Sequence, residues 1–229
     1  SRSTNARRSM TRFATFCLVA VILTGLEAQA GDIVGTVKLT SPVKERAVGK
    51  KKIRPSKDWG ADYDKDAEVP KGVNENEYTV IEVLGDKLPS TPRKVDLVQK
   101  NKTFSPHVLV VPKGSTIRFV NQDDFEHNVY SVSEPGAFDI GRYRGKFRED
   151  QFTEANALEI FCGLHPRMNG YIVVAPNNFF AKADGSGKYK ISGLPAGTYQ
   201  VRFWHPRAES KTVTVKVPAT GSVTQDINL

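Results

Sequence analysis

The stretch "EIFCGLHPRMNG", residues 159–170, carries three side chains that can bind a soft metal ion. Cys162, His165 and Met168 follow one another at intervals of three residues. A disulfide would need a second cysteine, and a catalytic thiol would need a base. A soft metal is instead bound by thiolate, imidazole and thioether groups together. The spacing therefore raises the hypothesis of a metal centre at this point of the chain.

The residues that lead into this stretch, "ALEIFC" (157–162), predict a β-strand. Leu158, Ile160 and Cys162 fall on one face of such a strand and Glu159 on the other, so the thiol is expected to point inward. The alternative is that the cysteine is a buried core thiol and the nearby methionine a core filler, with no metal at all.

The amino terminus resembles a secretory signal. Three arginines lead into the apolar run "FATFCLVAVILTGL" (13–26), and "AQA" (28–30) supplies a small-residue cleavage pattern. We expect residues 1–30 to be a signal peptide cleaved near Ala30, which would place the mature protein in the periplasm or outside the cell. A membrane anchor is the alternative, but the apolar run is short for a stable membrane span.

Cleavage there would leave Cys162 as a lone cysteine, because Cys17 lies inside the apolar run and the chain has two cysteines in all. Exported proteins enter an oxidising compartment in which cysteines usually pair. A lone thiol in such a protein needs another purpose, and metal binding supplies one.

Charge indicates no nucleic-acid partner. The full chain carries a net charge of +8, and loss of four arginines and Glu27 with the signal would lower it to +5. Much of the positive charge lies in "KERAVGKKKIRPSK" (44–57), which is followed by the acidic "DWGADYDKD" (58–66). Such alternating charge blocks are typical of a solvated loop.

The rest of the chain predicts an all-β protein. We expect strands at 32–40 and 77–85, then two strands in "HVLVVPKGSTIRFVNQDD" (107–124) and a short one in "HNVYSVS" (127–133). "GAFDIGRYRGKFRED" (136–150) is expected to be a glycine-rich, charged excursion. Short strands separated by Gly- and Pro-rich turns favour β-sandwiches, and no segment predicts an amphipathic helix.

A metal centre of the blue-copper kind needs two imidazoles, one thiolate and a weak axial thioether. The chain has four histidines: His107, His127, His165 and His205. His127 is the best candidate for the second imidazole, since it begins a strand that should neighbour "ALEIFC". Zinc held by the same side chains remains an alternative.

Two segments together resemble the cupredoxin family, in its plastocyanin- and amicyanin-like branch. They are "FSPHVLVVPKGSTIRFVNQDDFEHNVYSV" (104–132) and "FCGLHPRMNGYIVV" (161–174). The resemblance covers roughly residues 95–176 and implies a Greek-key β-sandwich. The tight Cys-x2-His-x2-Met loop resembles amicyanin more than plastocyanin.

This resemblance also implies the roles of individual residues. One type 1 copper ion would be bound by His127, Cys162, His165 and Met168. Asn128 would tie the two ligand loops together near the sulfur and orient the ligands. Electrons would enter or leave at the His165 edge, in exchange with a redox protein such as a cytochrome c or a dehydrogenase.

The carboxyl-terminal segment "ADGSGKYKISGLPAGTYQVRFWH" (183–205) resembles the carboxypeptidase regulatory-like family, a smaller transthyretin-like sandwich. Such modules open on a strand of the kind seen in "VGTVKL" (34–39). We therefore predict that residues 31–93 and 177–229 form one split sandwich, with a cupredoxin domain at 94–176 between its halves. The alternative is two unrelated edges packed onto the cupredoxin.

These patterns predict an exported one-electron carrier rather than an enzyme. A trinuclear copper cluster needs more histidines than the whole chain has, a binuclear copper centre needs two cysteines, and no G-x-S-x-G hydrolase motif is present. The arrangement also resembles bacterial methylamine-utilisation proteins, which implies a periplasmic dehydrogenase nearby. Copper delivery, and a surface interaction module without redox activity, remain the alternatives.

Overall fold

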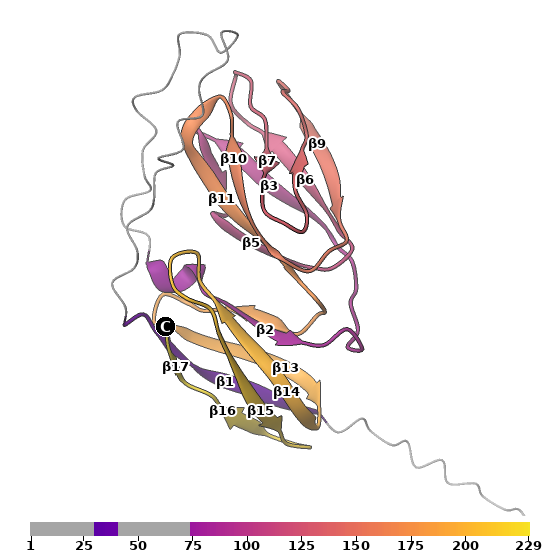
Figure 1. Cartoon of the computed structure of the whole chain (residues 1–229), viewed down its shortest axis with the longest axis vertical. Coiled ribbons are helices and arrows are strands. Elements are labelled where there is room, and N and C mark those ends of the chain that lie inside the picture. The colour runs from indigo at the N-terminus through magenta and orange to yellow at the C-terminus, as the bar shows by residue number, and fades with distance from the viewer. Residues whose placement is uncertain (1–29, 41–73) are drawn as a thin grey trace, which may run out of the picture.

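The computed structural model describes residues 30–40 and 74–229, and these residues form four β-sheets. The all-β prediction is therefore confirmed. Figure 1 shows that the sheets gather into two groups, one above the other. We call them the upper sandwich and the lower sandwich. The predicted signal peptide and the charged segment at 44–66 lie outside the described residues.

The upper sandwich consists of two sheets around one apolar core. One sheet has the strand order β5-β11-β10-β7-β8 and the other β4-β3-β6-β9. Its strands are β3 (Lys94–Lys100), β4 (Thr103–Ser105), β5 (Val108–Pro112), β6 (Ser115–Asn121), β7 (Tyr130–Ser131), β8 (Phe138–Asp139), β9 (Phe147–Phe152), β10 (Ala157–Cys162) and β11 (His165–Ala175). The core between the sheets includes Leu97, Phe119, Leu158, Ile160 and Ile172.

The lower sandwich draws its strands from both sides of the upper one in sequence. Its sheets have the orders β13-β1-β16, with β17 also paired to β1, and β12-β2-β14-β15. The strands are β1 (Ala30–Lys38), β2 (Val80–Leu84), β12 (Phe180–Lys182), β13 (Lys188–Pro195), β14 (Gly197–Trp204), β15 (Lys211–Val217), β16 (Ser222–Thr224) and β17 (Ile227–Asn228).

Two strands from the amino-terminal half are central to this lower sandwich. β1 pairs with β13 on one side and with β16 on the other, and β2 lies between β12 and β14. Gly35 in β1 passes so close to the chain at Gln225 that an added Cβ would lie 2.0 Å from its carbonyl oxygen. The approach of these distant segments therefore requires glycine at this position.

A third apolar cluster joins the two sandwiches. Val108 of β5 and Tyr171 and Val173 of β11 pack against Val80 of β2, with Trp204 of β14 beside them. The alternate residues of β11, such as Ile172, point into the upper core instead. The second half of β11 is thus buried on both faces, which suits its apolar run "YIVVA" (171–175).

Several local expectations need correction. Residues 75–78 form a 3-10 turn, η1 (Glu75–Tyr78), so the expected strand at 77–85 begins only at Val80. Within 136–150, predicted as an excursion, the chain already forms β8 and begins β9. β3 was not predicted, because its apolar alternation is weak. The polar Gln99 is buried on the same face as Leu97, whereas the apolar Val98 between them is half-buried on the other face.

The described residues contain no helix that is long and apolar enough to cross a membrane.

Candidate metal centre

The hairpin between β10 and β11 places Cys162 and His165 side by side. Phe161 pairs with Asn169 across the two strands, whereas Cys162 pairs with His165, so residues 166–168 have no partner in β10. Residues three apart point to opposite sides of a regular strand. The irregularity removes this restriction, and both His165 and Met168 are buried.

His127 reaches the same place from a separate part of the chain. It lies between β6 and β7 and forms an isolated bridge with Tyr143, in which each backbone N–H donates to the other's carbonyl oxygen at 3.1 and 2.8 Å. β7 pairs with β10 through Tyr130 and Phe161. This pairing brings the histidine alongside the end of β10.

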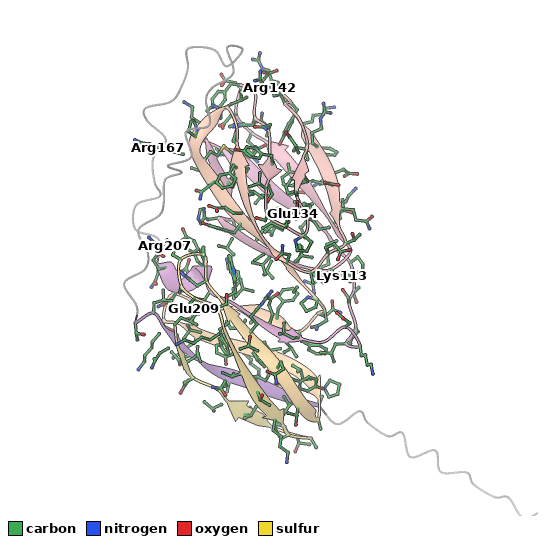
Figure 2. The ribbon with its side chains drawn as sticks, in the orientation of Figure 1. Lys113, Glu134, Arg142, Arg167, Arg207 and Glu209 are labelled. Atoms are coloured by element: carbon green, nitrogen blue, oxygen red, sulfur yellow. The ribbon has the colours of Figure 1, made fainter. Side chains whose placement is uncertain are left out.

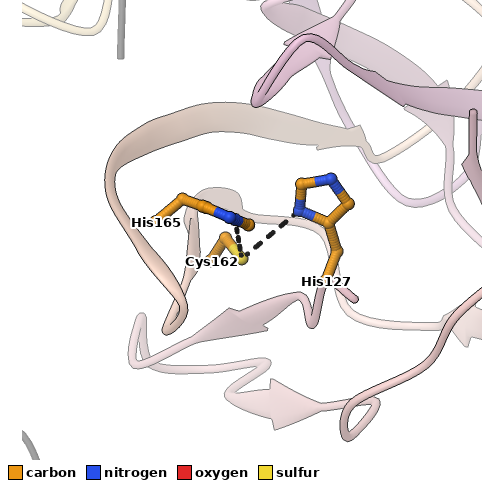
Figure 3. A group of neighbouring side chains, drawn as sticks. All are labelled: His127, Cys162 and His165. Atoms are coloured by element: carbon orange, nitrogen blue, oxygen red, sulfur yellow. Dashed lines mark hydrogen bonds between the residues drawn. The ribbon is translucent and has the colours of Figure 1, made fainter. Parts of the chain in front are cut away.

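The three side chains converge on the sulfur. The distance from Cys162 Sγ to His165 Nδ1 is 3.4 Å and to His127 Nδ1 is 3.6 Å. Figure 3 shows the two imidazoles on either side of the thiol, each directing this nitrogen toward it. Their ligand atoms all lie within 4.8 Å of one another, and all three residues are buried. Within the described part of the chain, this is a cluster close enough to hold one metal ion.

Met168 is also buried, with 1% of its surface exposed, and belongs to the same apolar core as Cys162. It follows His165 on the unpaired bulge of β11. A thioether in this position is available to a metal bound at the cluster.

Asn128 connects the two parts of the chain that carry the cluster. Its side-chain oxygen accepts a hydrogen bond of 2.6 Å from the backbone N–H of Gly163, the residue after Cys162. The segment that carries His127 is thus fastened to the turn between β10 and β11.

The sequence analysis missed Asp123 and Phe125. Asp123 Oδ2 lies 2.8 Å from His127 Nε2, and its side chain is 7% exposed. The Phe125 ring lies 5.2 Å from the ring of His127 and 5.3 Å from that of His165, measured between centroids. In the turn "NQDDFEHN" (121–128), the spacing of Asp and His does not show which side chains point inward, so the sequence carries no signal for this contact.

Burial controls the protonation of the cluster without a metal. It raises the pKa of the Cys162 thiol, although backbone hydrogen bonds from Asn128, Leu164 and His165 act in the opposite direction. Burial also lowers the pKa of His127, with Asp123 opposing the shift. At neutral pH and without a metal, the Cys162 thiol and the His127 imidazole are therefore both neutral. A metal ion would have to displace the thiol proton.

The other two histidines lie away from this cluster and have structural contacts. The His107 ring packs 4.8 Å from Tyr78 and 5.5 Å from Tyr171, at the junction of the sandwiches. His205 follows β14, is 1% exposed, and contacts the backbone oxygen of Glu75 through Nε2 at 3.2 Å.

The donor set of the cluster fits a soft or borderline metal. It offers two imidazole nitrogens, one thiol sulfur and a nearby thioether, in a buried place lined by apolar side chains. Hard cations such as Mg²⁺ and Ca²⁺ prefer oxygen ligands, whereas copper and zinc accept nitrogen and sulfur.

Comparison with known proteins gives partial likenesses to copper proteins. No protein-family model matches the chain, and no curated protein matches it. Among solved structures, a purple cupredoxin from Nitrosopumilus maritimus matches with 23% identity over 35% of this chain and 99% of its own, at a TM-score of 0.33. A reduced amicyanin variant matches with 23% identity over 40% of this chain and 85% of its own, at a TM-score of 0.33.

A copper-containing nitrite reductase from Thermus scotoductus SA-01 is 29% identical over 38% of this chain, at a TM-score of 0.34. The match spans 23% of that enzyme. Each of these likenesses involves less than half of the present chain, so the chemistry of the metal centre is inferred from its own donor atoms.

Proposed function

We propose that this protein binds one type 1 copper ion and carries single electrons between redox proteins. The ligands would be His127, Cys162, His165 and Met168. The observation that supports this most directly is the pair of imidazole Nδ1 atoms at 3.4 and 3.6 Å from one buried thiol. Bound copper would supply reversible one-electron chemistry between Cu(II) and Cu(I).

The chain's contribution is a fixed set of ligands. His127 is held by the bridge to Tyr143, and Cys162 and His165 by the hairpin of β10 and β11. Because these contacts lie in the backbone of the sandwich, they would limit rearrangement of the ligands when the charge of the ion changes. Cys162 is 3% exposed, so little water would reach a metal-bound sulfur.

We place electron exchange at the His165 edge of the upper sandwich. His165 is 7% exposed, whereas Pro166 and Arg167 beside it are exposed. Figure 2 shows Arg167 at the surface of the upper sandwich, and Arg142 at its far end from the lower sandwich. These cations would favour an acidic surface on a partner such as a cytochrome c or a dehydrogenase.

The segments that flank the copper-binding domain would have a role of their own. The lower sandwich would be a carboxypeptidase regulatory-like module built from residues 31–93 and 177–229, with the copper-binding domain at 94–176. It would be a spacer or docking element rather than an enzyme. Export would depend on the signal sequence at residues 1–30.

The first test is to add Cu(II) to the purified metal-free protein and record its visible spectrum, with Cys162→Ser as the matched control. We expect an intense blue band that a mild reductant bleaches and that the serine variant lacks, because the band requires a thiolate ligand. A colourless protein that retains zinc or binds neither metal would contradict the proposal. A blue protein that quickly loses its copper to a chelator would favour delivery instead.

A further inference from the structure

His127 is fully buried, and both of its ring nitrogens have a neighbour. Nδ1 lies 3.6 Å from Cys162 Sγ, and Nε2 lies 2.8 Å from Asp123 Oδ2. The second contact is a short hydrogen bond between two side chains that are almost completely removed from water. It joins Asp123 to a residue that is proposed to bind the metal.

The hydrogen bonds around Asp123 show which partner donates. Its Oδ1 lies 2.7 Å from the backbone nitrogen of Asn101, and its Oδ2 lies 3.1 Å from that of Lys102. Backbone N–H groups can only donate, so the carboxylate accepts on both oxygens. An ionised carboxylate accepts and does not donate, so the hydrogen of the third contact belongs to His127 Nε2.

That assignment determines the tautomer of the ring. A neutral imidazole carries one hydrogen, and with that hydrogen on Nε2 the lone pair is on Nδ1. Nδ1 is the nitrogen that faces Cys162 Sγ. The carboxylate therefore leaves the correct nitrogen available to a metal ion.

The support for Asp123 does not come from the metal site itself. Asn101 and Lys102 form the turn between β3 and β4 with positive φ angles of 52° and 55°, and this conformation directs both of their N–H groups to the carboxylate. Asn121 adds a third constraint, because its side-chain oxygen accepts from the Asp123 backbone N–H at 2.9 Å. These contacts hold the carboxylate through backbone groups that are not proposed metal ligands.

We propose that Asp123 is a positioning residue, which holds His127 as the Nε2–H tautomer and makes its Nδ1 a stronger ligand. The tautomer of His127 does not depend on the proposed copper function, whereas the strength of Nδ1 as a ligand rests on it. The negative charge of Asp123 would stabilise Cu(II) more than Cu(I) through the imidazole. A buried carboxylate that hydrogen-bonds a ligating histidine commonly acts in this way.

The test uses Asp123→Asn in the full chain. Asp123→Ala, made beside it, removes the acceptor entirely, whereas the asparagine loses the charge but keeps one oxygen that can still accept from Lys102 and His127. The matched control is Asp124→Asn, which removes the same charge from the adjacent, exposed residue. Nitrogen-15 NMR of the histidine rings at pH 7 reports the tautomer in the metal-free protein.

We expect His127 to be protonated at Nε2 in the unchanged protein and in the Asp124→Asn variant. Asp123→Ala should shift it toward the Nδ1–H tautomer, and both Asp123 variants should weaken Cu(II) binding about 10- to 100-fold and raise the reduction potential. Asp123→Glu, which keeps the charge, should restore part of the affinity.

Two results would overturn the inference. One is an Nδ1–H tautomer of His127 in the unchanged metal-free protein, which can be measured even if the asparagine variant does not fold. The other is a folded Asp123→Ala variant with the tautomer and copper affinity of the control. If the unchanged protein forms no blue site but the tautomer shifts as expected, the positioning role stands and the proposed copper function fails.

Discussion

At the scale of single residues, the metal centre depends on contacts between parts of the chain that are far apart in sequence. Cys162 and His127 are separated by 35 residues, and Asn128 bonds the backbone of Gly163 over the same interval. Tyr143 lies beside the site and fastens His127 through two backbone hydrogen bonds. These supporting residues would set the geometry of the ligands without binding the metal.

Asn128→Ala should weaken copper binding. The change leaves the Gly163 N–H without its acceptor and loosens the turn between Cys162 and His165. We expect a loss of about 10- to 100-fold in Cu(II) affinity, measured by competition with a chelator. Asn178→Ala is the control, because Asn178 makes comparable hydrogen bonds to Thr91 outside the metal centre. Equal affinities in the two variants would refute this role for Asn128.

Tyr143→Phe should lower stability. The buried Tyr143 hydroxyl donates to Gln99 Oε1 and lies 2.9 Å from the carbonyl oxygen of Phe119. Its removal leaves the buried Gln99 Oε1 without this donor, which costs about 1–3 kcal/mol in the free energy of unfolding. Urea denaturation of the metal-free protein measures this cost. Tyr199→Phe, whose exposed hydroxyl bonds Pro195, is a control expected to change stability much less.

At the scale of elements, the short turn η1 is attached to the end of β14 by His205. Arg207 donates its backbone N–H to His205 Nδ1 at 3.2 Å, so the neutral ring carries its hydrogen on Nε2 and donates to the Glu75 carbonyl oxygen. A second proton on Nδ1 would oppose the Arg207 N–H. Burial lowers the pKa of His205 from 6.5, and the backbone oxygen and carboxylate of Glu75 only partly offset this effect.

This pKa shift predicts a loss of stability in mild acid. Below the unfolded pKa of about 6.5, His205 binds a proton in the unfolded chain but stays neutral in the folded protein until the pH reaches its lowered pKa. Stability should therefore fall as the pH decreases from about 6.5 to the lowered folded pKa, by about 1.4 kcal/mol for each unit of the shift. His127 contributes in the same direction.

His205→Gln isolates the contribution of this one residue. The variant should lose less free energy of unfolding between pH 7 and pH 5 than the unchanged protein does, both measured metal-free in urea. An equal or greater loss in the variant would show that His205 does not titrate as proposed.

At the scale of the whole molecule, the two sandwiches share an apolar junction. Val108, Tyr171 and Val173 of the upper sandwich are at most 8% exposed because Val80 and Trp204 of the lower one cover them. Lys182 of β12 also donates to the Val108 carbonyl oxygen at 3.1 Å. The stability of the upper sandwich should thus depend on the presence of its neighbour.

Residues 94–176 expressed alone should be less stable than the full chain and should self-associate. Removal of the lower sandwich exposes the apolar face of β5 and β11, and such a patch favours aggregation. Light scattering and thermal unfolding measure both effects. Val108→Thr with Val173→Thr should reduce the association of the fragment. A fragment that stays monomeric with full stability would show that the junction contributes little.

Some features of this protein could be predicted from sequence because they depend on neighbouring residues. The alternation in "ALEIFC" predicts correctly that Leu158, Ile160 and Cys162 share a buried face. Side-chain direction in a strand has a period of two and requires no knowledge of the partner strand. The spacing of Cys162, His165 and Met168 likewise places three candidate ligands on one short segment.

Other features were decided only by the tertiary structure. The bulge at residues 166–168 depends on the register between β10 and β11, and the contact between Asp123 and His127 depends on the turn at Asn101 and Lys102. The junction of the sandwiches depends on which face of β11 meets β2. Each of these requires the pairing of distant segments, which is determined by the packing of the whole chain and not by the periodicity of any one segment.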